Sequence, residues 1–155
     1  LIALVNSNAE TEKEQVLKAF HTQWQHELLV VNQWLTAQAT CRLPNTVDRV
    51  RSLIELIDFD MKNPNNVRAL IGAFCNANPM NFHRADGTGY ALLADIVLQL
   101  NRINPQVASK MLTPLTRWRK YPITSKLMEV QLRRIMDEPN LSKDVYEVVS
   151  KSLNA

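Results

Sequence analysis

Glycine is scarce in this 155-residue chain, which contains only Gly72, Gly87 and Gly89. An all-β domain of this size needs many tight turns, and glycine is a preferred residue in most of them. No segment alternates apolar and polar residues over the length of a strand. The sequence therefore argues against an all-β protein, and its 46% of apolar residues argues against disorder.

Cysteines and long apolar runs are also few. Cys41 and Cys75 form no CxxC pair and are too few for a disulfide framework, so we expect two small, buried thiols. They fit a reducing compartment, and we predict a cytoplasmic protein.

The apolar start LIALV is too short for a signal-peptide core or a membrane span, so we expect no membrane contact. Because the chain starts with Leu1, we expect it to be processed or cut from a longer polypeptide.

The net charge of +3 is too small to indicate nucleic-acid binding unless it is concentrated in one place. The densest basic run is RWRKY, at residues 117–121. Aromatic rings between cations are typical of sites for single-stranded nucleic acid. The same cations can also cover the last carbonyls of a helix that ends before Pro122. We favour this structural interpretation and expect no nucleic-acid partner.

Metal-ligand patterns are missing as well. The stretch HELLV, at residues 26–30, lacks the second histidine of the zinc-peptidase signature HExxH, because Val30 stands in its place. His21 lies five residues before His26, so the two imidazoles point to different faces of a helix, and His83 is far away in the sequence. We therefore predict no zinc site and interpret HELLV as the polar edge of an amphipathic helix.

Other catalytic patterns are equally weak. No serine stands in a nucleophile elbow, and neither cysteine has a histidine close to it in the sequence. The carboxylates Glu55, Asp58 and Asp60 are ordinary for the end of a helix. The loop RADGTGY, at residues 84–90, is followed by a helical pattern but preceded by no strand. A turn that caps the helix is therefore favoured over a phosphate site.

Helical periodicity dominates the chain, because apolar residues recur at steps of three and four. The segment Tyr90–Leu100 is apolar nearly all round, which predicts a buried central helix. Asn-Pro pairs and Ser142 predict helix starts, and Pro114 predicts a kink or an early end. Short connections predict antiparallel neighbours, and hence an all-α, solenoid-like stack of helix pairs. The stripes are Val16–Phe20, Leu28–Leu35, Val47–Ile57, Val67–Phe74, Tyr90–Leu100, Val107–Trp118, Met128–Met136 and Val145–Leu153.

Several segments, taken in order, resemble a known family. They are QWQHELLVVNQWLTAQAT (23–40), NPNNVRALIGAF (63–74), NPMNFHRADGTGY (78–90), LNRINPQVASKMLTPLTRWRKY (100–121) and LSKDVYEVVSKSL (141–153). Together they are similar to the C-terminal helical domain of bacterial aminopeptidase N, a zinc metallo-aminopeptidase of the gluzincin type. The resemblance runs from about His21 to the end of the chain. Each motif alone is weak, and the specificity lies in the ordered set.

The resemblance implies a fold and a place in a larger enzyme. The fold would be a superhelical stack of antiparallel helix pairs, an α-solenoid of the ARM or HEAT kind, forming one domain over residues 1–155. The catalytic residues, the HExxH zinc ligands and the GAMEN motif would belong to an upstream catalytic domain of the same chain. This fragment would hold no cofactor and catalyse nothing, whereas the parent enzyme would use zinc to remove N-terminal residues from peptides. The fragment would cap the active-site chamber.

Arg68 and Lys110 are the predicted substrate-binding residues. Both lie beside apolar stripes and within two turns of a helix opened by Asn-Pro, where a cation opposes the helix dipole. One interpretation is that each side chain lays its stem along apolar surface and keeps its charge in water. The other follows from the resemblance, in which basic residues at the matching positions face the internal cavity. There they would meet a peptide's carbonyls or terminal carboxylate.

The main alternative is a protein of another class, a free-standing helical scaffold that binds a partner protein through its concave face. A gene product that contains HExxH upstream of this segment would exclude the scaffold. An open reading frame that starts near Leu1 would exclude the aminopeptidase domain.

Overall fold

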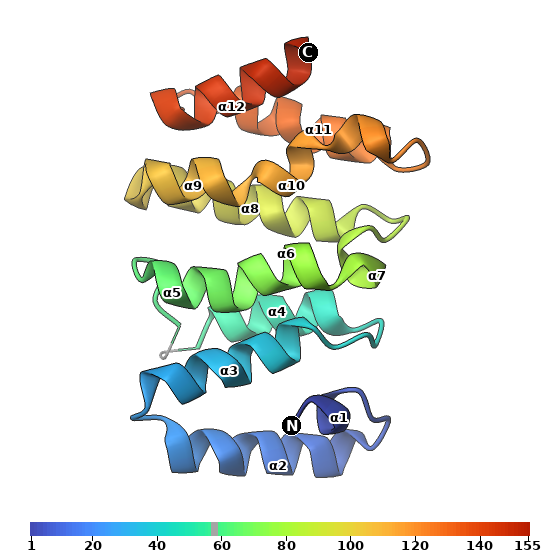
Figure 1. Ribbon diagram of the computed structural model, residues 1–155, viewed down its shortest axis with the longest axis vertical. Helices are drawn as coiled ribbons and strands as arrows, with labels where there is room; N and C mark the ends of the chain where they lie inside the picture. The colour runs from blue at the N-terminus through green and yellow to red at the C-terminus, as the bar shows by residue number, and fades with distance from the viewer. Residues whose placement is uncertain (57–58) are drawn as a thin grey trace. The chain divides into compact units, whose positions relative to one another are not determined.

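The computed structural model describes residues 1–56 and 59–155, and its regular elements over these residues are all helical (Figure 1). The predicted stripe residue Ile57 and the carboxylate Asp58 lie outside the described residues. The chain forms two compact units, Leu1–Asn81 and Phe82–Ala155, and each is described by itself below. The absence of strands from the described part confirms the all-α prediction.

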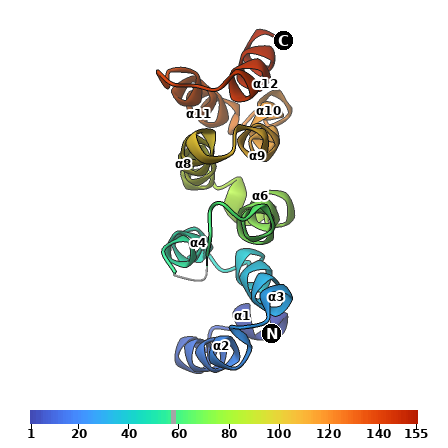
Figure 2. The same ribbon diagram turned by 90° about the vertical axis from the view of Figure 1, so that its left-hand side faces the viewer.

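The first unit is built on antiparallel helices. In Figure 1, α2 and α3 run in opposite directions, and Figure 2 shows α2 and α4 in one layer and α1, α3 and α6 in the other. The elements are α1 (Ile2–Val5), α2 (Glu10–Trp24), α3 (Leu28–Ala39), α4 (Thr46–Ile54), α5 (Pro64–Val67), the π-helical turn η1 (Arg68–Gly72), α6 (Ala73–Ala77) and α7 (Pro79–Phe82), whose last residue opens the second unit.

The core of the first unit lies between α3, α4 and the helix that runs from α5 to α6. Leu35, Val50, Leu70 and Phe74 are at most 2% exposed and come from all three. Polar side chains close the end of α3, where the Cys41 carbonyl accepts hydrogen bonds from Asn78 Nδ2 at 2.6 Å and Thr46 Oγ1 at 2.8 Å. Buried carbonyls beyond a helix end need such donors, because no further turn supplies them.

The π-helical turn has an identifiable cause. The Thr36 hydroxyl of α3 donates to the Ala69 carbonyl at 2.7 Å. The backbone N–H of Ala73 then bonds the Arg68 carbonyl, one residue earlier than an α-helix would use. A side chain that takes a carbonyl out of the helical ladder opens the helix at that point.

The second unit also pairs antiparallel helices. Figure 2 shows α8 and α11 in one layer and α9, α10 and α12 in the other. The elements are α8 (Thr88–Ile103), α9 (Pro105–Met111), α10 (Thr113–Thr116), the 3₁₀ turn η2 (Trp118–Lys120), α11 (Ser125–Met136) and α12 (Lys143–Asn154).

The predicted central helix is confirmed as α8. Nine of its sixteen residues are buried, and Leu93 and Ile96 are at most 1% exposed. The predicted helix signals also hold. Ser142 Oγ accepts from the Val145 N–H at 3.3 Å, and Asn104 Oδ1 accepts from the Val107 N–H at 3.2 Å. Pro114 stands in the first turn of α10, where the predicted Val107–Trp118 helix is broken.

One local prediction is wrong. The HELLV stretch is not wholly helical, because α2 ends at Trp24 and α3 begins at Leu28. His26 is in the turn between them, and Glu27 is the N-cap residue of α3. The two polar residues that resembled a zinc motif are therefore part of the turn between two helices.

Candidate functional site

Arg68 lies on the surface of the first unit, at the start of the π-helical turn. The helix begins at Pro64, and the Asn63 side chain caps it by accepting from the Asn65 N–H at 3.0 Å. The Arg68 guanidinium makes one long hydrogen bond, from Nη1 to Asn65 Oδ1 at 3.4 Å. A guanidinium has five N–H donors in a fixed fork, so this bond leaves most of its capacity for a ligand.

Lys110 is exposed on α9 of the second unit. The predicted opposition between its charge and the helix dipole is wrong, because α9 ends at Met111 and Lys110 stands in its last turn. A cation at this end is favoured by the dipole. The prediction considered only how close Lys110 lies to the Asn104-Pro105 start, but α9 has 7 residues, so Lys110 is also in its last turn. Arg68 and Lys110 belong to different units, and each is described within its own.

The histidines do not assemble a metal site. His21 packs its ring against Trp34 with the centroids 4.7 Å apart, and His26 is exposed in the turn after α2. Over residues 1–56 and 59–155, no group of three histidine, cysteine, aspartate or glutamate side chains could hold a metal ion. Both cysteines are buried, as predicted, and burial raises the pKa of the Cys75 thiol.

The RADGTGY loop is a capped turn. The Asp86 carboxylate accepts from the Thr88 N–H at 3.0 Å and from the Thr88 hydroxyl at 2.7 Å, which occupies the N-terminus of α8. These hydrogen bonds, aided by Arg84, hold the pKa of Asp86 below its ordinary value. Gly87 adopts a φ of 75°, which favours glycine. A carboxylate already fills the place that a phosphate would take, so the predicted turn is the correct interpretation.

The RWRKY run closes the end of another helix. Arg119 donates to the Ser152 carbonyl at 2.6 Å and to the Leu153 carbonyl at 3.1 Å, both in the last turn of α12. Its guanidinium also lies 4.0 Å from the centre of the Trp118 ring. The prediction that these cations cover helix carbonyls is correct in kind, but the helix is α12 and not the one in which the run lies.

Sequence reasoning missed a polar cluster around the buried Tyr90. The Tyr90 hydroxyl lies 2.7 Å from His83 Nδ1 and 2.8 Å from Thr124 Oγ1, and the His83 ring stacks on Tyr121 at 4.1 Å. Burial lowers the pKa of His83 and raises that of Tyr90. None of the cavities described here is lined by these groups. We therefore interpret the cluster as a network of core side chains that satisfy one another's hydrogen bonds. His83 lies seven residues before Tyr90, whereas Thr124 lies 34 residues after it, and no local sequence pattern indicates these contacts.

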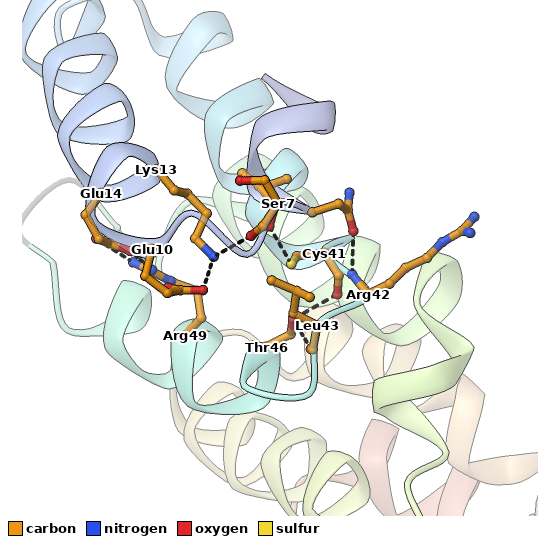
Figure 3. A network of polar contacts seen from close by, with 11 residues as sticks. Ser7, Glu10, Lys13, Glu14, Cys41, Arg42, Leu43, Thr46 and Arg49 are labelled. Carbon is orange, nitrogen blue, oxygen red and sulfur yellow. Dashed lines mark hydrogen bonds and ion pairs between the residues drawn. The ribbon is translucent and has the colours of Figure 1, made fainter.

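A second polar network ties the first helices together (Figure 3). The Lys13 ammonium, on a residue 3% exposed, lies 2.6 Å from Glu10 Oε1 and 3.4 Å from the Ser7 carbonyl. Cys41 Sγ donates to the Val5 carbonyl at 2.9 Å. The cavity beside Lys13 and Cys41 measures about 10 Å³, which is room for one water molecule at most. This network holds α1 and α2 against α3 and offers no ligand site.

The family of the chain follows from its agreement with a family model. Residues 1–154 match DUF3458_C, a domain of unknown function described as ARM repeats. The chain belongs to this family. Its ARM-repeat class confirms the predicted solenoid of paired helices.

Aminopeptidases are among the proteins similar to this member of the DUF3458_C family. The chain is 43% identical to aminopeptidase N of Caulobacter vibrioides and 37% identical to that of Escherichia coli, in each case over 91% of the chain. A crystal structure of Legionella pneumophila aminopeptidase A in complex with aspartic acid matches 99% of the chain with a TM-score of 0.92 and 35% identity. These matches confirm the similarity to the C-terminal region of aminopeptidase N.

The chain spans only a small part of these relatives. It covers 16% of either aminopeptidase N and 18% of the aminopeptidase A chain. None of the helices that the structure describes has both the length and the apolar character needed to cross a membrane.

Proposed function

We propose that this chain is the non-catalytic C-terminal part of a zinc aminopeptidase, and that it helps to admit and orient peptides in the chamber of that enzyme. The observation that carries the proposal is the similarity to aminopeptidase N over 91% of the chain, at 37–43% identity. Zinc and the catalytic groups would lie in an upstream domain. The chain's own role would be to cap the chamber and to supply charged groups along the peptide's path.

Arg68 and Lys110 would supply those charges. Both side chains are exposed, and neither forms an ion pair in the described part of the chain. An aminopeptidase holds the substrate's amino end at its metal, so a cation further along would face the peptide's carbonyls or its terminal carboxylate. The π-helical turn that starts at Arg68 supports this role, because such turns occur often at functional sites.

The test is Arg68→Ala and Lys110→Ala in the parent enzyme. Each variant should raise KM for short peptides with a free carboxylate. The rise should correspond to the loss of about 1–3 kcal/mol of binding free energy, as for a charge-assisted contact. The same peptides with an amidated C-terminus, and an aminoacyl-anilide, should be hydrolysed almost as by the wild type. Equal losses on all three substrates would show a structural role, and unchanged kinetics would place both side chains outside the peptide's path.

Matched controls are available in each unit. Lys18 on α2 and Lys126 on α11 are exposed lysines. Figure 2 shows α2 in the layer opposite α6, and α11 in the layer opposite α9. Lys18→Ala and Lys126→Ala remove the same charge from helices of the other layer, so they should leave KM unchanged for every substrate. A gene product without an upstream HExxH would favour the alternative, a free-standing helical scaffold.

A further inference from the structure

The second unit contains a chemically labile pair of residues that the proposed function does not use. Asp86 is the only aspartate of the chain that is followed by glycine, and it is exposed in the turn before α8. The backbone nitrogen of such a glycine can attack the side-chain carbon Cγ of the aspartate, because no Cβ hinders the approach. Pairs of this kind isomerise readily in unfolded peptides.

The isomerisation needs no oxidant, metal or second substrate. The Gly87 nitrogen loses its proton and forms a C–N bond to Cγ of Asp86, and one carboxyl oxygen leaves as water, which closes a five-membered succinimide. Water then opens the ring at either carbonyl. Cleavage of the bond between the nitrogen and the α-carbonyl carbon gives isoaspartate, whose backbone runs through Cβ and Cγ and whose α-carboxylate is left as the side group.

Hydrogen bonds within the turn engage both reacting groups. The Gly87 N–H donates to the Arg84 carbonyl at 3.0 Å. Oδ1 of Asp86 accepts from the Thr88 hydroxyl at 2.7 Å and from the Thr88 N–H at 3.0 Å. Oδ2 accepts from Arg84 Nη2 at 2.9 Å and from Arg84 Nε at 3.2 Å. These bonds favour the ionised carboxylate, which is a poorer electrophile than the protonated acid.

The backbone of Gly87 is also fixed on its other side. Its carbonyl accepts from the Ala91 N–H at 3.0 Å, which joins it to the first turn of α8. The Leu127 side chain of α11 packs over it, with Cδ1 3.6 Å from the place that a Cβ would occupy. Ring closure requires the peptide between Asp86 and Gly87 to rotate toward the side chain, and these contacts oppose that rotation.

We propose that Asp86-Gly87 is a site of aspartate isomerisation, which the hydrogen bonds from Thr88 and Arg84 keep closed in the folded protein. Isomerisation would add a methylene group to the backbone and move the carboxylate away from Thr88, at the start of the central helix α8. Loss of these hydrogen bonds would therefore expose the protein to a covalent change that unwinds the start of α8. The proposal does not depend on the proposed function or on the roles of Arg68 and Lys110.

Prolonged incubation of the longer protein near neutral pH tests the protection. Trypsin releases residues 85–102 as one peptide, in which chromatography separates isoaspartate from aspartate and electron-transfer fragmentation locates it. A synthetic peptide of residues 83–90 gives the rate without the folded turn. We expect the folded protein to form isoaspartate much more slowly than this peptide. Equal rates, or no isoaspartate in the peptide, would overturn the proposal.

Substitution of Thr88 tests which hydrogen bond gives the protection. Thr88→Ala should speed isomerisation in the folded protein by about tenfold, a factor that one hydrogen bond to a charged group can supply. Thr88→Ser keeps the hydroxyl and should isomerise at the wild-type rate. The matched control is Thr113→Ala, because Thr113 is an exposed first residue of α10 whose hydroxyl bonds the Lys110 carbonyl. Equal rates in Thr88→Ala and Thr113→Ala would overturn the role of Thr88.

Hydrogen exchange separates local opening of the turn from unfolding of the helix. Thr88→Ala should leave exchange of the amides in the middle of α8 unchanged. If those amides exchange faster by the same factor as isomerisation, the helix as a whole opens, and the protection by the turn is overturned.

Discussion

The guanidinium of Arg119 lies 2.6 Å from the carbonyl oxygen of Ser152, thirty-three residues later in the chain. Together with its bond to Leu153, it satisfies carbonyls at the end of α12 that have no partner within the helix. The contact ties the last helix to the short η2 turn and gives the basic run a structural role.

Arg119→Ala should therefore destabilise α12 more than the other helices of its unit. Losing charge-assisted hydrogen bonds at an exposed site should lower the free energy of unfolding by about 1–2 kcal/mol. Hydrogen exchange should accelerate more for the amides of α12 than for those of α8. Arg117→Ala, at an exposed arginine two residues earlier, is the matched control and should change neither quantity. Equal effects of the two variants would refute the capping role.

Shortening a buried side chain of α8 should lower the free energy of unfolding far more than shortening an exposed side chain of α11. Leu93 and Ile96 are at most 1% exposed, so Leu93→Ala or Ile96→Ala should lower the free energy of unfolding by about 2–5 kcal/mol. Val130 on α11 is 58% exposed, and Val130→Ala should cost much less. Urea unfolding of the purified chain measures all three. A cost at Leu93 no larger than at Val130 would show that α8 is not the core of its unit.

His83 should make the stability of the second unit depend on pH. Burial lowers its folded-state pKa, so the unfolded chain, with an ordinary pKa of about 6.5, binds the proton more readily. The neutral ring therefore contributes fully above about pH 6.5, and its contribution is lost as the pH falls below that value. When the pH is lowered through this value, the urea-unfolding midpoint should fall more for the wild type than for His83→Asn.

The control for this pH effect is His26→Asn, because His26 is exposed in the turn between α2 and α3. It should show the same pH dependence as the wild type. If His83→Asn also keeps the full dependence, the half-buried His83 ring is not its source.

The chain by itself should hold no stoichiometric zinc and hydrolyse no aminoacyl-anilide. The physical reason is that zinc in peptidases needs three protein ligands around one point, and the described residues bring no such group together. Metal analysis after dialysis, combined with the anilide assay, checks both statements. One zinc per chain together with turnover would contradict this prediction.

The sequence by itself determined the helices. Apolar spacing, Asn63, Asn104 and Ser142 as caps, and Pro114 as a breaker act within a turn or two of the chain, so their effects can be read locally. The ordered set of segments also indicated the similarity to aminopeptidase N. The candidate residues Arg68 and Lys110 were proposed from that resemblance, and their substrate contacts remain a prediction.

Only the tertiary structure decided which polar groups meet. Thr36 reaches across to Ala69 and opens the π-helical turn, and the Tyr90 hydroxyl donates to Thr124 Oγ1. Such pairs depend on how whole helices pack, and residues thirty or more positions apart leave no periodic trace in the sequence. The structure also showed that α9 ends at Met111, which places Lys110 at the favourable end of the helix dipole.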